Sequence, residues 1–177
     1  MNTRKPGAVA ALLVSMLLLT QAAVAQDDSQ GTERRRIELG RLAEGPAIVG
    51  GGLMLGEPSG LTAKLWFTET GFGADLAVAW SFADNAGVYM HANGIFHLAI
   101  VETGGGRYLI PYLGAGVFYR VGESSRVGLR VPVGLAMFPL TQLPLEFFAE
   151  IAPGIGLLPD TGPSFGAGLG VRFYLPF

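Results

Sequence analysis

From about residue 46 to the end of the chain, apolar residues alternate with small or polar ones, position by position. In the last segment the apolar set is Phe165, Ala167, Leu169, Val171, Phe173, Leu175 and Phe177. The residues between them are Ser164, Gly166, Gly168, Gly170, Arg172 and Tyr174. Because successive side chains of a β-strand point to opposite faces, this period of two predicts strands with one apolar face and one small or polar face.

Turn residues divide this region into segments. The separators cover residues 56–60, 68–71, 83–86, 102–106, 122–125, 139–142 and 159–163. They leave eight segments of roughly 8–13 residues, close to the length of a tilted strand that crosses a bilayer. Beyond residue 25 no apolar stretch is long enough for a spanning helix, and the only other structure that satisfies its backbone in lipid is a closed barrel. The fold predicted is all-β, an eight-stranded antiparallel up-and-down transmembrane β-barrel.

The apolar face of these strands is expected to point outward, to lipid. The interior of an eight-stranded barrel is only just wide enough for side chains, so large apolar residues from every strand would overfill it. The outward phase assigned in this way contains no charged residue, and it places aromatic residues at both ends, as expected at membrane interfaces. These are Trp80, Phe82, Tyr119 and Phe165 near the extracellular ends, and Phe67, Phe96, Phe147 and Phe173 near the periplasmic ends.

Three prolines conflict with continuous strands. Pro111, Pro132 and Pro153 lie inside predicted segments, and proline removes a hydrogen bond from the ladder between strands. A closed barrel has no edge strand that could accommodate them. Local bulges or shifted strand boundaries are therefore expected at these positions.

The N-terminal 25 residues have the pattern of a cleaved secretory signal. Arg4 and Lys5 precede an apolar run over 8–19, and a small-x-small pattern ends at Ala25. Residues 26–45 are polar and are expected to form a periplasmic extension before the barrel at 46–177. The chain has no cysteine and a formal net charge of −2, so neither a disulfide scaffold nor a nucleic-acid partner is indicated. The expected location is the bacterial outer membrane, with outer-membrane lipid as a partner.

The inward phase includes a set of charged residues selected as candidates for the lumen. They are Lys64, Asp75, Arg120, Arg130, Glu146, Glu150 and Arg172. Charges enclosed by protein are costly unless they are paired, so these residues predict a salt-bridged network that fills the barrel. An alternative interpretation is a switchable gate that opens a narrow conduit. If the last two strands turn near residues 160–162, Glu150 and Arg172 lie opposite each other and are expected to pair.

No catalytic or metal-binding constellation is predicted. His91, Asn93 and His97 point inward from the fourth segment, and the two histidines are about 20 Å apart if both lie on one strand. That separation is too large for a shared metal ion. The glycine runs 50–52 and 104–106 lack the Lys-Ser/Thr of a phosphate-binding loop, so the second is assigned to a turn and the first to curvature of the wall. No cofactor is expected.

Several stretches of the chain resemble a family of small bacterial outer-membrane β-barrels whose function is uncharacterised. The resemblance lies in residues 56–64, 125–135, 144–153 and 168–174, and it extends over about 46–174. That family is similar in architecture to the transmembrane domain of OmpA. The resemblance implies that Pro132 and Pro153 are tolerated within strands. The role expected from the sequence as a whole is structural or interactive in the cell envelope and not catalytic, and the alternatives are a narrow gated pore and a lipid-A-modifying enzyme.

The last residue, Phe177, is similar to the terminal aromatic read by the outer-membrane barrel assembly machinery, the second expected partner. Pro176 departs from that pattern, because many such signals continue as plain strand. We expect deletion of Phe177 to lower the amount of folded protein in membranes. The measurement is the folded fraction on unboiled gels, and equal amounts with and without Phe177 would contradict the assignment.

Overall fold

The computed structural model describes residues 47–67, 70–81, 87–122, 125–139 and 144–175. Its strands are β1 (Ala47–Glu57), β2 (Ser59–Phe67), β3 (Phe72–Ser81), β4 (Gly87–His97), β5 (Val101–Glu102), β6 (Tyr108–Val121), β7 (Arg126–Arg130), β8 (Val133–Phe138), β9 (Leu145–Leu158) and β10 (Gly162–Leu175). No helix in these residues has the length and apolar character needed to cross a membrane. The predicted signal (1–25), the whole predicted extension (26–45), Phe82 and Phe177 lie outside the described residues.

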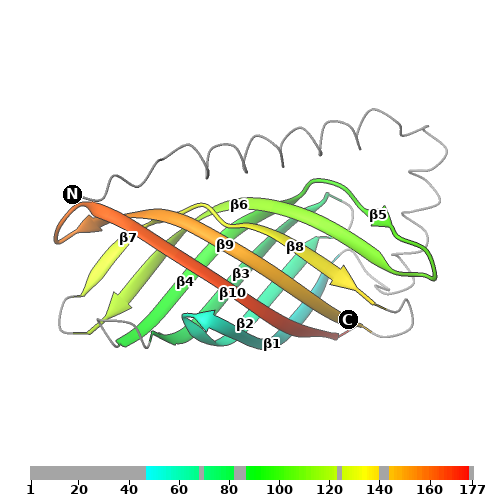
Figure 1. Ribbon diagram of the computed structural model, residues 1–177, viewed down its shortest axis with the longest axis horizontal. Helices are drawn as coiled ribbons and strands as arrows, with labels where there is room; N and C mark the ends of the chain where they lie inside the picture. Colours follow the sequence, from blue (N-terminus) through cyan, green and yellow to red (C-terminus); the bar gives the residue numbers. More distant parts are fainter. Residues whose placement is uncertain (1–46, 68–69, 82–86, 123–124, 140–143, 176–177) are drawn as a thin grey trace, which may run out of the picture. The chain divides into compact units, whose positions relative to one another are not determined.

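The strands close into an antiparallel ring. Strands β1 to β4 pair in chain order, β4 pairs with β6, β9 pairs with β10, and β1 pairs with β10 over Val49–Glu57. Strands β7 and β8 both lie between β6 and β9 and together occupy one place, while β5 pairs only with the start of β6. The ring therefore has eight places, and the predicted eight-stranded barrel is confirmed. In Figure 1 the strands run side by side and obliquely around the barrel. We call the end where β1 begins and β10 ends the terminal end, and the opposite end the mouth.

The outer wall is apolar. Leu76 in β3 is 57% exposed and Leu169 in β10 is 64% exposed, and both lie midway along their strands. Among the described residues of the eight ring places, no charged side chain is classed as exposed. Exposed Trp80, Tyr119 and Phe165 lie towards the mouth, and exposed Phe67, Phe96, Phe147 and Phe173 lie towards the terminal end. The predicted outward phase and its two aromatic groups are thus confirmed for the described residues.

The three prolines have different effects on the strands. Pro132 separates β7 from β8, so a shifted boundary occurs there as expected. Pro111 and Pro153 stay inside the continuous strands β6 and β9 without the bulge or boundary that strand pairing alone led us to expect, and for Pro153 this agrees with what the family resemblance implied. Their carbonyls still accept hydrogen bonds, from Leu98 N at 2.9 Å for Pro111 and from Val131 N at 2.9 Å for Pro153. The one register shift recorded in the described pairs lies between Val127 and Gly128 on β7, opposite the end of β9 at Leu158, and not at Pro111, Pro132 or Pro153.

Connections at the mouth are short, and the longest described connection is at the terminal end. Only Pro58 separates β1 from β2, and three residues separate β9 from β10. At the terminal end, residues 98–107 between β4 and β6 contain β5 and a turn with Gly104, Gly105 and Gly106 at φ 88°, 65° and 73°. Positive φ favours glycine, and the predicted turn at these three glycines is confirmed.

Glycines inside the barrel make room for aromatic rings on the neighbouring strand. Four such pairs are directly in register: Gly50 with Tyr174, Gly134 with Tyr112, Gly170 with Phe148, and Gly128 with Phe118. A Cβ added at each of these glycines would meet the ring opposite it, for example within 2.9 Å of Tyr174 for Gly50. The interior therefore holds large rings as well as glycines and charges, which the sequence pattern did not predict. Each of these four rings fits because the residue opposite it on the adjacent strand is a glycine, which has no side chain.

Substitution of Gly134 tests this packing. We expect Gly134→Ala to destabilise the barrel by about 1–3 kcal/mol, because the added methyl overlaps the Tyr112 ring in a filled interior. Gly51→Ala is the matched control, since a Cβ at Gly51 has no neighbour within 4 Å. Unfolding in urea, followed by the folded band on unboiled gels, measures both. Equal midpoints for Gly134→Ala and Gly51→Ala would contradict the packing argument.

Candidate functional site

The centre of the lumen holds six buried charged side chains, which we call the lumen charge network. Its members are Lys64, Asp75, Arg130, Glu146, Glu150 and Arg172, each at most 7% exposed. Three are cations and three are anions, so the network is neutral when all are ionised. It consists of six of the seven residues selected from the sequence. The seventh, Arg120, is half-buried and makes no ion pair within the described residues.

Glu146 is the most connected member of the network. Its Oε2 accepts hydrogen bonds from Lys64 Nζ at 2.9 Å and from the Tyr174 hydroxyl at 2.6 Å. Its Oε1 accepts a hydrogen bond from Arg172 Nη1 at 2.7 Å. These three donors come from β2 and β10, whereas Glu146 lies at the start of β9. One carboxylate therefore ties together three strands of the barrel, and β2 and β9 are not adjacent in it.

Arg172 links Glu146 to Asp75. Its Nη2 lies 3.8 Å from Asp75 Oδ2, and Thr62 Oγ1 accepts hydrogen bonds from Nε at 3.1 Å and Nη2 at 3.0 Å. The guanidinium also lies 3.8 Å above the centre of the Phe148 ring, which is a favourable cation–π geometry. Asp75 Oδ1 accepts a 2.6 Å hydrogen bond from Asn93 Nδ2. Each terminal nitrogen of Arg172 is thus occupied by a protein partner.

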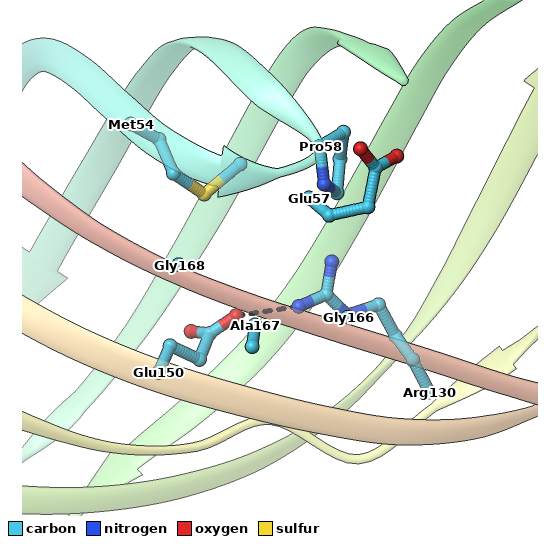
Figure 2. A pocket seen from close by; sticks show the side chains of 8 residues that line it. All are labelled: Met54, Glu57, Pro58, Arg130, Glu150, Gly166, Ala167 and Gly168. Atoms are coloured by element: carbon cyan, nitrogen blue, oxygen red, sulfur yellow. Dashed lines mark hydrogen bonds and ion pairs between the residues drawn. The ribbon is translucent and has the colours of Figure 1, made fainter. Parts of the chain in front are cut away.

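A second ion pair lies nearer the mouth. Arg130 Nη2 donates to Glu150 Oε1 at 2.5 Å, and the Tyr112 hydroxyl donates to Glu150 Oε2 at 3.0 Å. Arg130 Nη1 lies 2.5 Å from His91 Nδ1 and 3.4 Å from the Tyr89 hydroxyl. Figure 2 shows this pair beside a small pocket that is partly open to solvent. The pocket is also lined by Met54, Glu57, Pro58 and residues 166–168.

The expected pairing of Glu150 with Arg172 is wrong. Arg172 is in register with Glu146, and Glu150 is in register with Gly168. Because Gly156 pairs with Gly162, the hairpin is centred on Pro159 and not on residues 160–162. The partner of Arg172 on β9 is therefore four residues earlier than expected. A shift by an even number of residues keeps the same side chains inside, so the phase was right although the pair was wrong.

The terminal end of the lumen contains an apolar cluster. Its buried members are Ile48, Trp66, Ile95, Tyr108, Ile110, Tyr112, Ala136, Phe138 and Tyr174. Rings in the cluster are close together, with centroids 6.1 Å apart for Trp66 and Phe138 and 5.8 Å for Phe138 and Tyr174. Lys64 Nζ lies 5.4 Å from the Trp66 ring, where the cluster meets the charge network. The lumen thus has a charged layer above an apolar layer.

Both histidines are buried and held by neighbours. His97 Nδ1 lies 2.8 Å from the carbonyl oxygen of Gly71, and His91 contacts Arg130 as described above. In the described part of the chain, no group of three or more His, Cys, Asp or Glu side chains is arranged to hold a metal ion. The sequence interpretation missed the hydroxyl partners Thr62, Tyr112 and Tyr174. The available signal was that all three share the inward phase with the charges.

A closed eight-place antiparallel ring with an apolar outer wall and a charged, packed interior is the fold of the small outer-membrane β-barrels. The chain matches the N-terminal β-barrel domain of Pseudomonas aeruginosa OprF with a TM-score of 0.50 and 17% identity, over 73% of this chain and 98% of that one. Two structures of the Yersinia pestis outer membrane protein Ail, one of them in a phospholipid bilayer nanodisc, each match with a TM-score of 0.37 and 14% identity. Each match covers 73% of this chain, and it covers 98% of the Ail chain in the nanodisc structure and 97% in the crystal structure.

In the comparisons of sequence, no protein-family model matches the chain and no curated protein matches it.

Proposed function

We propose that this protein is a structural barrel of the bacterial outer membrane, with a lumen that is plugged by its own side chains. The observation that carries the proposal is the distribution of charge: six charged side chains are buried inside and paired, and the described wall exposes none. Such a wall suits a hydrocarbon environment, where a charged side chain at the midplane costs several kcal/mol. The role proposed is mechanical support or interaction within the envelope.

Two layers support the plug. The lumen charge network crosses the middle of the barrel, and the apolar cluster around Trp66 and Phe138 lies below it at the terminal end. An ion that crossed the barrel would have to separate buried ion pairs and then pass a dry layer of rings. Loss of one ion pair would leave the apolar layer in place. The plug is therefore expected to survive single substitutions in the network.

Single-channel recording in planar bilayers tests the proposal. We expect no conductance steps in 1 M KCl from the wild-type barrel, and none from Glu150→Gln, which removes the carboxylate that Arg130 contacts. Gel mobility without boiling confirms that both proteins are folded. Regular steps from the wild-type barrel would contradict the plug.

A narrow gated pore is the second candidate, and the pocket in Figure 2 is the observation that favours it. The Arg130 side chain lies at the edge of this pocket between Glu150 and Glu57. Opening would require Arg130 to leave Glu150. In that case Glu150→Gln would show more frequent conductance steps than the wild type. The same recordings therefore separate the two candidates.

A further inference from the structure

Two arginines at the mouth are arranged differently from every charge in the lumen network. Arg120 near the end of β6 and Arg126 at the start of β7 are in register with each other, and Arg120 is also in register with Tyr89 on β4. All three side chains are in the inward phase. They form a row across β4, β6 and β7 at the mouth of the barrel.

Neither arginine has a carboxylate partner in the described part of the chain. Lys64, Arg130 and Arg172 pair with Glu146, Glu150 and Asp75, so the buried acids are already matched. Like charges directly opposite each other on adjacent strands are destabilising. The row therefore carries two positive charges that no described carboxylate balances, and a bound anion would offset them.

The two arginine side chains lie against different neighbours. Arg120 Cζ lies 5.7 Å from the centre of the Tyr89 ring, and its Nε is buried without a hydrogen-bond partner. Arg126 extends over two glycines that are paired with each other, Gly156 on β9 and Gly162 on β10. A Cβ at Gly162 would lie 2.6 Å from Arg126 Nη2, and one at Gly156 would meet Arg126 Nε. Because these two glycines have no side chains, the Arg126 side chain has room to lie over them inside the mouth of the barrel.

We propose that Arg120 and Arg126 form a binding site for a phosphate-type oxyanion at the mouth of the barrel. Guanidinium groups match phosphate oxygens in a forked geometry, and charge-assisted hydrogen bonds of this kind are stronger than neutral ones. Tyr89 supports Arg120 from below as a positioning residue. The phosphate can come from a soluble molecule or from a lipid headgroup, and the chemistry recognised is the same. The site does not depend on whether the lumen conducts.

The test is a binding titration with the full chain refolded in a neutral detergent at low ionic strength, where screening is weak. Pyrophosphate is the soluble probe and lipopolysaccharide micelles are the lipid probe, both added to protein whose folding has been checked on unboiled gels. Arg120→Gln and Arg126→Gln each remove one guanidinium. Arg107→Gln removes an exposed arginine near the terminal end and is the matched control for net charge.

We expect each of the two mouth variants to weaken binding by about tenfold, the loss of one charged hydrogen bond, and Arg107→Gln to leave it within about twofold. Pyrophosphate should also raise the unfolding temperature of the wild type but not that of a variant carrying both Arg120→Gln and Arg126→Gln, because a ligand that binds only the folded state stabilises it. Binding of pyrophosphate identifies a soluble ligand, and binding of lipopolysaccharide alone identifies a headgroup. Three results would overturn the proposal: neither probe binds the wild type, the probes bind the mouth variants as tightly as the wild type, or Arg107→Gln weakens binding as much as the mouth variants do.

Discussion

Glu146→Gln is expected to destabilise the barrel by about 3–5 kcal/mol, the cost of removing one partner from a buried ion pair. The carboxylate accepts hydrogen bonds from Lys64, Arg172 and Tyr174, and it is 0% exposed. Glutamine has the same size but no charge, so the network retains three cations and only two anions. Urea unfolding of the detergent-refolded protein measures the loss. Glu102→Gln, on exposed β5, is the control and should stay within about 0.5 kcal/mol of the wild type.

A second variant separates charge balance from lost contacts. Lys64→Met combined with Glu146→Gln leaves two cations, Arg130 and Arg172, with two anions, Asp75 and Glu150. Removal of both partners of a buried pair costs less than removal of one, so the double variant should be more stable than Glu146→Gln alone. If the losses of stability from Lys64→Met and from Glu146→Gln simply add in the double variant, the two residues do not stabilise each other, and this would contradict the network.

Leu76→Arg is expected to destabilise the folded state by about 2–4 kcal/mol in lipid vesicles, the cost of a cation at the bilayer midplane on a barrel wall. Leu76 is 57% exposed and lies in register with Ala63 and Ala92, midway along β3. On a water-exposed surface the same substitution would change stability by no more than about 0.5 kcal/mol.

The matched control is Leu158→Arg. Leu158 is 63% exposed and ends β9 at the mouth, where the interface lies and the expected cost falls to about 0–1 kcal/mol. Reversible unfolding in urea with vesicles present gives both values. If Leu76→Arg and Leu158→Arg cost the same small amount, the outer wall does not face hydrocarbon.

The sequence could predict which side chains enter the lumen, because the period of two survives any even shift in register. It could not predict which of them pair. Arg172 contacts Glu146 and not Glu150 because the last hairpin is centred on Pro159, and a turn centre cannot be read to within two residues from a run of Pro, Asp, Thr and Gly. Six of the seven selected charged residues are buried in the lumen, and the seventh, Arg120, lies in the same inward phase but is half-buried.

The interior rings were missed for a related reason. Each ring fits only because a glycine lies opposite it on the adjacent strand, as Gly134 does for Tyr112. That relation depends on cross-strand register and not on the pattern along one strand. The same holds for the row of Tyr89, Arg120 and Arg126, whose shared position becomes visible only once β4, β6 and β7 are aligned.

The central claim is that the outer wall contacts hydrocarbon. Because the chain has no cysteine, a nitroxide can be attached to one engineered cysteine at Leu169, midway along β10, and to another at Gly105, in the exposed turn at the terminal end. The measurement is the collision rate of each nitroxide with oxygen and with a water-soluble nickel chelate in lipid vesicles. We predict high oxygen and low nickel accessibility at 169, with the reverse at 105. High nickel accessibility at 169, equal to that at 105, would contradict the account.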